Sequence, residues 1–89
     1  MKKSFVIIIC RNGQTEKIPL KNKKAKDKWL YDYFTTGEEK WWAWDKYCLL
    51  GNGQISFEKW VKLFLKRNEC SIYQSFYIRQ GKILLIKEL

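Results

Sequence analysis

Five lysines stand within the eight residues KNKKAKDK, in the N-terminal third of the chain. They are Lys21, Lys23, Lys24, Lys26 and Lys28. We expect a helix to begin here, and a helix N-terminus disfavours each nearby cation by about 0.3–1 kcal/mol. Because folding gains nothing obvious from these lysines, the cluster indicates an anionic partner, most simply one that carries phosphate. The alternative is a solvated charged surface that favours solubility.

A second group of cations recurs with helical spacing in the sequence FEKWVKLFLKR, around residue 62. It consists of Lys59, Lys62, Lys66 and Arg67. If this stripe lies beside the first cluster, the two together form a surface that can follow a nucleic-acid backbone. Taken alone, the stripe is the ordinary polar face of an amphipathic helix.

Three tryptophans occupy the four positions 41–44, in the sequence WWAW. Successive residues of a helix are about 100° apart, so the three indoles cannot all face the core. We expect Trp42, which is offset from the other two rings, to reach the surface. An indole beside lysines can stack on a nucleobase or anchor a protein interface. Core packing is the alternative for each ring.

Catalytic chemistry has little support in the sequence. The chain has no histidine, which excludes a Ser-His or Cys-His nucleophile pair within it. Its nine carboxylates are scattered, and no glycine-rich phosphate loop is present. Cys10, Cys48 and Cys70 are odd in number and lack CxxC spacing, so we expect buried, reduced thiols. We therefore expect a non-enzymatic protein with no catalytic residue, no cofactor and no bound metal.

The segment GNGQISFEKW, residues 51–60, resembles the second half of a calcium-binding EF-hand loop. With Gly53 at position 6 of that loop, position 1 is Cys48 and position 12 is Lys59. Calcium needs a carboxylate at both of these positions. We therefore expect no calcium binding, and instead a glycine turn followed by a helix that Ser56 caps.

The residues around these groups predict a strand hairpin at the N-terminus. Residues 4–10 (SFVIIIC) form an apolar run that is typical of an inner strand covered on both faces. Asn-Gly at 12–13 favours a type I′ hairpin, whose register pairs Ile7 with Ile18. Pro19 cannot donate to a strand ladder, which predicts that the second strand lies at an edge.

The C-terminal segment SIYQSFYIRQGKILLIKEL predicts a second hairpin, with a turn at residues 80–81 and a bulge as an alternative. In this hairpin Tyr73 and Tyr77 share one face, and Phe76 and Ile78 point the opposite way. The final strand, ILLIKEL, could form a sheet edge, and an exposed edge would allow a homodimer.

Three helices are expected between the hairpins: over residues 21–34, from a Thr36–Glu39 capping box onward, and over residues 57–68. The second helix is expected to bury Trp41, Trp44 and Cys48. The predicted fold is therefore α+β, with the order ββαααββ in one domain of residues 1–89. The N- and C-terminal hairpins form one antiparallel sheet, and the helices pack on one face of it.

Net charge is the strongest indication of function. The chain carries 18 Lys and Arg against nine Asp and Glu, a net charge of +9. No segment is long and apolar enough for a membrane span or a signal peptide, so we expect a cytoplasmic protein. The first hypothesis is a small protein that binds nucleic acid through its Lys/Arg surface. The alternative is an inhibitor or immunity-type protein, encoded by a phage or mobile element. It would block an enzyme, such as one that processes nucleic acid, by binding an acidic surface of that enzyme.

Overall fold

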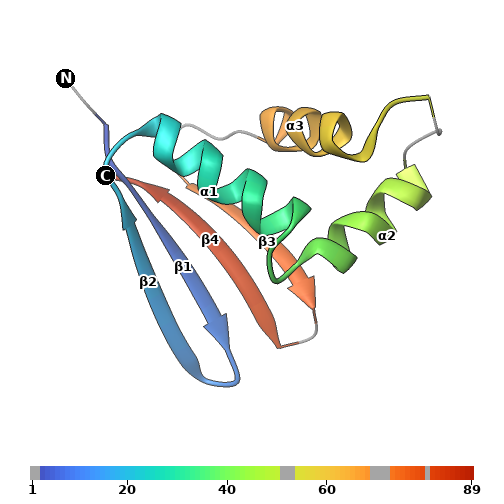
Figure 1. The fold of residues 1–89 in the computed structure, drawn as a ribbon. Coiled ribbons are helices and arrows are strands. Elements are labelled where there is room, and N and C mark those ends of the chain that lie inside the picture. The colour runs from blue at the N-terminus through green and yellow to red at the C-terminus, as the bar shows by residue number, and fades with distance from the viewer. Residues whose placement is uncertain (1–2, 51–53, 69–72, 80) are drawn as a thin grey trace. The chain divides into compact units, whose positions relative to one another are not determined.

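The computed structural model describes residues 3–50, 54–68, 73–79 and 81–89. In chain order the elements are β1 (Phe5–Arg11), β2 (Gln14–Leu20), α1 (Lys23–Thr35), α2 (Lys40–Leu50), α3 (Phe57–Arg67), β3 (Tyr73–Arg79) and β4 (Lys82–Glu88). The fold is α+β, as the sequence predicts: two hairpins supply a four-stranded antiparallel sheet, and three helices lie between them in the chain (Figure 1).

The chain forms two compact units. The sheet unit consists of residues 1–27 and 70–89, and it contains all four strands and the first turn of α1. The helical unit consists of residues 28–69 and contains the remainder of α1 together with α2 and α3.

The strand order in the sheet is β2-β1-β4-β3. The predicted register of the first hairpin is confirmed, because Ile7 pairs with Ile18, and Pro19 lies on the edge strand β2. The expectation that the C-terminal strand forms an edge is wrong. β4 pairs with β1 on one side and with β3 on the other, so β2 and β3 are the edges.

Both hairpin turns use positive backbone φ angles. Asn12 has φ 49° and Gly13 has φ 79°, the combination that a type I′ turn requires. Gly81 also has φ 79°, and the register shifts between Tyr77 and Arg79, so the second hairpin contains the bulge that the sequence allowed.

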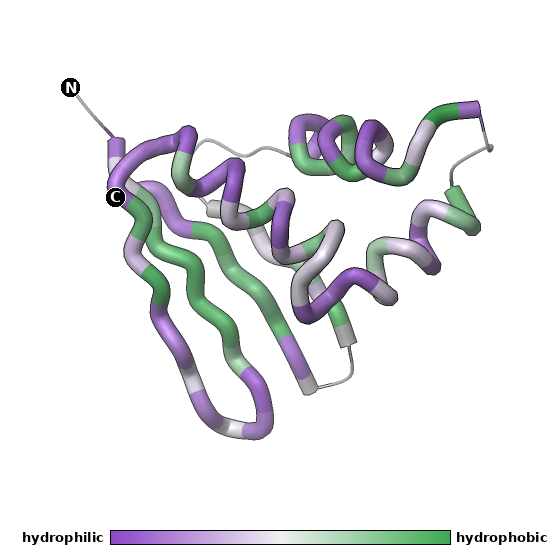
Figure 2. Tube along the Cα trace, in the orientation of Figure 1, coloured by the Kyte–Doolittle hydropathy of each residue, from purple (hydrophilic) through white to green (hydrophobic). Residues whose placement is uncertain are grey.

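The two faces of the sheet differ in burial. On the buried face, seven apolar side chains are at most 6% exposed; they are Phe5, Ile7, Ile9, Phe76, Ile78, Leu84 and Ile86. On the opposite face, called here the open face, the apolar side chains are half-buried or exposed; they include Val6, Ile8, Cys10, Ile83, Leu85 and Tyr77. The prediction that β1 is covered on both sides is therefore wrong. Figure 2 shows that the apolar residues of the sheet concentrate on β1 and β4.

Side-chain caps begin two of the helices. The Asn22 side chain accepts a hydrogen bond from the Ala25 amide at 2.8 Å, at the start of α1. Ser56 accepts one from the Lys59 amide at 3.2 Å, which confirms the predicted N-cap of α3. Three residues of the predicted α3 stripe, Phe57, Trp60 and Val61, are buried.

The predicted capping box before α2 is wrong. The Thr36 hydroxyl donates to the carbonyl of Asp32 at 3.3 Å, and the Glu39 amide donates to the carbonyl of Tyr33 at 3.3 Å. The residues from Thr36 to Glu39 therefore close the end of α1, and α2 begins only at Lys40. The Thr-x-x-Glu spacing fitted both outcomes, because a hydroxyl can also bond back to a carbonyl four residues earlier.

The prediction for the buried side of α2 is also wrong. Trp41 is 66% exposed, Trp44 is 40% exposed and Cys48 is exposed, whereas Ala43 is buried. The sequence KWWAWDKYCLL is apolar around most of the helix, so periodicity alone does not select a face.

The core of the helical unit is aromatic. The Phe34 side chain is fully buried, and its ring centroid lies 5.5 Å from that of Trp42 and 6.3 Å from that of Phe64. Trp60 stacks on Phe64 at 5.2 Å, which continues the cluster along α3. These rings join all three helices of the unit.

Gly37 makes the connection between α1 and α2 possible. A Cβ atom at this position would lie 2.8 Å from the Tyr33 Cα and 3.0 Å from the Asp32 carbonyl oxygen, both of which are backbone atoms. The Gly37 amide also donates to that same oxygen at 2.7 Å, which keeps the chain close to α1.

Replacing Gly37 with alanine is therefore expected to destabilise the protein by about 1–3 kcal/mol, because the backbone must move to admit the methyl group. Urea unfolding followed by circular dichroism measures this difference. Asp45→Ala on the exposed side of α2 is the control, expected within about 0.5 kcal/mol of the parent protein. Equal stabilities for the two variants would contradict the steric argument.

Candidate nucleic-acid interface

The N-terminal turn of α1 is fixed to the sheet within the sheet unit. The Lys26 ammonium lies 4.9 Å from the ring centroid of Phe5, at the start of β1, and 3.0 Å from the Asp27 carboxylate. Lys26 is only 6% exposed. The structure thus removes Lys26 from the predicted binding surface, because its charge is held inside the unit rather than presented to solvent.

Strand pairing brings further lysines to the same place. Phe5 pairs with Leu20, the residue before Lys21, and Val6 pairs with Lys87. The ends of β2 and β4 and the starts of β1 and α1 therefore meet at one end of the sheet (Figure 1). The exposed lysines of this region, called here the basic end, are Lys3, Lys21, Lys23, Lys24 and Lys87.

Two carboxylates offset part of the charge at the basic end. Glu88 lies 3.7 Å from the Lys3 ammonium, and Asp27 lies 3.7 Å from that of Lys23 in addition to its contact with Lys26. The lysines outnumber these acids, and the Lys3 and Lys23 side chains remain 67% and 60% exposed. Exposed ion pairs of this kind are weak, so phosphate can compete for the lysines.

Sequence reasoning missed Lys3 and Lys87 as members of this group. They stand near opposite ends of the chain, Lys3 beside Lys2 and Lys87 with no neighbouring lysine, so neither belongs to a long lysine cluster. The antiparallel pairing of β1 with β4 brings them together. That pairing is the signal that would have identified them, because it places the start of one strand beside the end of the other.

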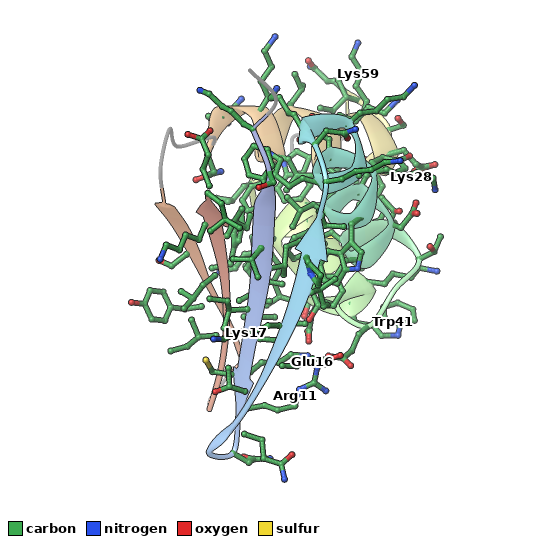
Figure 3. All side chains as sticks on the ribbon, turned by 90° about the vertical axis from the view of Figure 1, so that its left-hand side faces the viewer. Arg11, Glu16, Lys17, Lys28, Trp41 and Lys59 are labelled. Carbon is green, nitrogen blue, oxygen red and sulfur yellow. The ribbon has the colours of Figure 1, made fainter. Side chains whose placement is uncertain are left out.

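The remaining predicted cations belong to the helical unit. Lys59, Lys62, Lys66 and Arg67 are all exposed on α3. The Lys62 ammonium lies 5.4 Å from the ring centroid of Tyr31 on α1, and Lys28 forms an ion pair with Asp32 at 2.9 Å. In Figure 3, Lys28 and Lys59 both extend outward from this unit. The α3 stripe and the outer surface of α1 are therefore neighbours within the unit.

Acidic groups reduce the suitability of the helical unit for phosphate. A hollow of about 420 Å³ lies beside Tyr31 and is bordered by the side chains of Asp32 and Glu58 as well as by Lys40. The unit as a whole contains seven Lys and Arg and six Asp and Glu. The sheet unit contains eleven Lys and Arg but only three Asp and Glu. Positive charge is thus concentrated in the sheet unit.

Trp42 does not take the exposed position expected for it. The ring is half-buried, 5.5 Å from Phe34 and 5.9 Å from Phe64, with the Lys46 ammonium 5.8 Å from its centroid. Position 42 lies on the side of α2 that faces the aromatic cluster. Trp41 is the exposed ring instead, with the Lys40 ammonium 5.4 Å from it.

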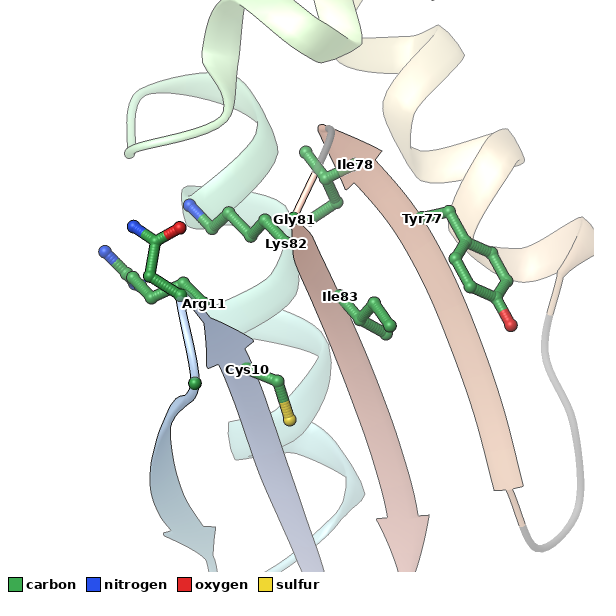
Figure 4. A pocket seen from close by; sticks show the side chains of 9 residues that line it. Cys10, Arg11, Tyr77, Ile78, Gly81, Lys82 and Ile83 are labelled. Carbon is green, nitrogen blue, oxygen red and sulfur yellow. The ribbon is translucent and has the colours of Figure 1, made fainter.

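Two further cations, Arg11 and Lys82, lie near the hairpin turns, at the end of the sheet opposite the basic end. Arg11 and Lys82 are direct partners in the β1–β4 register, and like charges at such positions oppose strand pairing. Burial lowers the pKa of Lys82, and the neighbouring Arg11 guanidinium lowers it further. Both residues border a hollow of about 540 Å³. Figure 4 shows their side chains on one side of the strands, with Cys10 and Ile83 on the other.

Metal chemistry finds no support among the described residues. Within that part of the chain, no three His, Cys, Asp or Glu side chains come together as a set that could hold a metal ion. Cys48 is exposed and Cys10 half-buried, contrary to the expectation of buried thiols. Cys70 and the glycine turn at 51–53, the centre of the EF-hand-like segment, lie outside the described residues. Every described helix is too short or too polar to cross a bilayer.

Comparisons with protein-family models, with curated proteins and with solved structures find no match to this chain.

Proposed function

We propose that the protein binds nucleic acid through the basic end of the sheet unit. The observation that carries this proposal is the convergence of three distant segments, which place five exposed lysines around the start of α1. Lysine ammonium groups bind phosphate mainly by charge and release the counterions condensed on the nucleic acid. Binding of this kind follows the backbone and needs no catalytic group.

The position of these lysines also supports a role outside folding. Lys23 and Lys24 lie in the first turn of α1. That turn contains no acidic residue that would complement the helix dipole. A bound phosphate would interact favourably with both the lysines and the helix N-terminus. The charge that opposes the isolated helix therefore becomes favourable once an anionic backbone is present.

The test is the triple variant Lys21→Gln, Lys23→Gln and Lys24→Gln. Fluorescence anisotropy with labelled duplex DNA and labelled single-stranded RNA measures affinity over a series of salt concentrations. At low salt we expect the triple variant to bind at least about tenfold more weakly. We expect the slope of log affinity against log salt to become shallower by about 1 for each lysine removed.

The matched control is Lys59→Gln, Lys62→Gln and Lys66→Gln on α3, which removes the same charge from the helical unit. This control is expected to retain most of the affinity and of the salt slope. Equal losses in both variants would show a general effect of net charge and overturn the proposed interface. Absence of binding by the parent protein to either nucleic acid at low salt would overturn the function itself.

A further inference from the structure

The open face of the sheet presents an apolar band with a basic border. Strand register places eleven described side chains on this face, in three rows across the sheet. The rows are Pro19, Val6 and Lys87; Lys17, Ile8, Leu85 and Ser75; and Thr15, Cys10, Ile83 and Tyr77. Two of these residues are lysines and none is acidic.

The acids of the sheet lie on the other side. Glu16 pairs with Ile9 and Glu88 pairs with Phe5, and both of these partners belong to the buried face. Figure 3 views the sheet nearly edge-on, with Lys17 on one side of it and Glu16 on the other. Among the side chains that the structure describes on the open face, all of the charge is therefore positive.

The apolar part of the open face runs along the two inner strands. Val6, Ile8 and Cys10 stand on β1, beside Ile83 and Leu85 on β4. Two adjacent strands are about 4.8 Å apart and rise about 3.4 Å per residue, so the band is about 10 Å wide and 13 Å long. At about 5.4 Å per turn, this length corresponds to the apolar stripe of a helix over two to three turns. The five side chains of this band are half-buried, so each keeps some apolar surface that a partner could cover.

One end of the band is hollowed. Cys10, Ile83 and Tyr77 border the hollow of about 540 Å³ near the hairpin turns, and their side chains lie together on one side of the strands (Figure 4). Tyr77 is 75% exposed, so a large part of its ring surface is in contact with solvent. A leucine, methionine or phenylalanine side chain of a partner would bury these groups.

We infer that the open face docks an amphipathic helix of another protein, with leucine-like residues at the centre of its contact surface and Asp or Glu along its margins. The positive charge of the open face argues against a second copy of this chain as the docked partner. Two open faces placed together would bring Lys17 and Lys87 of both copies into one interface, with no carboxylate among the described side chains of either face to pair with them. An acidic partner pairs with those lysines instead and gains electrostatic steering toward the site. This inference shares Lys87 with the basic end but does not rest on the nucleic-acid proposal, because it is argued from the apolar band and from Lys17.

The test uses a synthetic helical peptide of about 18 residues, with leucines on one side and glutamates on both flanks, and an isomer with lysine in place of glutamate. Methyl and amide NMR spectra of the full chain are recorded during titration. The acidic peptide is expected to cause saturable shifts at the methyl groups of Val6, Ile8, Ile83 and Leu85. The basic isomer is expected to cause none.

Two variants strengthen the test. Lys17→Glu changes an exposed side chain. It is expected to weaken binding of the acidic peptide by about three- to tenfold at low salt and to allow the basic isomer to bind. Ile8→Asp is expected to weaken binding of the acidic peptide at least tenfold, which corresponds to about 1.4 kcal/mol of binding free energy. Unchanged methyl signals from Ile7 and Leu84 verify its fold. The variant with Lys21, Lys23 and Lys24 changed to glutamine should bind the acidic peptide as the parent does, so failure of one proposal is distinguishable from failure of the other.

Several results would overturn the inference. Equal binding of the two peptides to the parent protein would remove the role of charge, and shifts confined to residues outside the open face would remove the site. Sedimentation equilibrium that shows self-association, lost in Ile8→Asp, would identify a second copy as the occupant. Shifts of the same methyl groups by duplex DNA would identify the face as a nucleic-acid surface.

Discussion

Replacing Ile7 with aspartate is expected to unfold the protein, whereas the same replacement at Ile8 should leave it folded. Ile7 is fully buried, and Ile8 is the next residue, on the open face. Holding a fully buried aspartate side chain uncharged at neutral pH costs about 4 kcal/mol. Loss of the isoleucine side chain from the core adds about 2–3 kcal/mol. The total is comparable to the whole free energy of unfolding of a small domain, about 5–15 kcal/mol.

At Ile8 the carboxylate can remain charged and solvated, so the expected cost is only about 1–2 kcal/mol, from strand propensity and partial burial. Far-ultraviolet circular dichroism and urea titration of both variants measure the contrast. Similar stabilities for the two variants would show that the faces of β1 do not differ in burial. The open face would then lose its basis as a docking surface.

Local chemistry explains why the first hairpin was predictable from sequence. Asn12 and Gly13 adopt positive φ at little cost, and the turn they form fixes every pair between β1 and β2. The start of α3 was predictable for a similar reason, since Ser56 bonds to an amide three residues away. Each of these features depends on atoms that are close together in the chain.

Features that depend on distant pairing were not predictable in this way. No local pattern shows that β4 inserts between β1 and β3, because its apolar residues suit an inner strand and an edge strand equally. The membership of Lys3 and Lys87 in the basic end follows from that pairing. Similarly, α2 is apolar on most sides, and only the position of the aromatic cluster determines that Trp42 faces inward and Trp41 outward.

Truncating Phe34 to alanine is expected to destabilise the protein by about 3–5 kcal/mol, the largest effect we expect from a single truncation in the helical unit. Its ring has no exposed surface and contacts Tyr33 on α1, Trp42 on α2 and Phe64 on α3. The truncation therefore leaves a cavity where all three helices meet, and the surrounding rings cannot close it without giving up the ring contacts that they make. Thermal unfolding by calorimetry and urea unfolding by tryptophan fluorescence measure the loss.

Tyr77→Ala is the matched control, because it removes an aromatic ring of similar size from the open face, where 75% of the residue is exposed. It is expected to change stability by no more than about 0.5 kcal/mol. Phe34→Leu, which keeps most of the apolar volume, is expected to recover a large part of the loss. If Phe34→Ala were as mild as Tyr77→Ala, the aromatic cluster would not be what holds α1, α2 and α3 together, and the helical unit would owe its stability to other contacts.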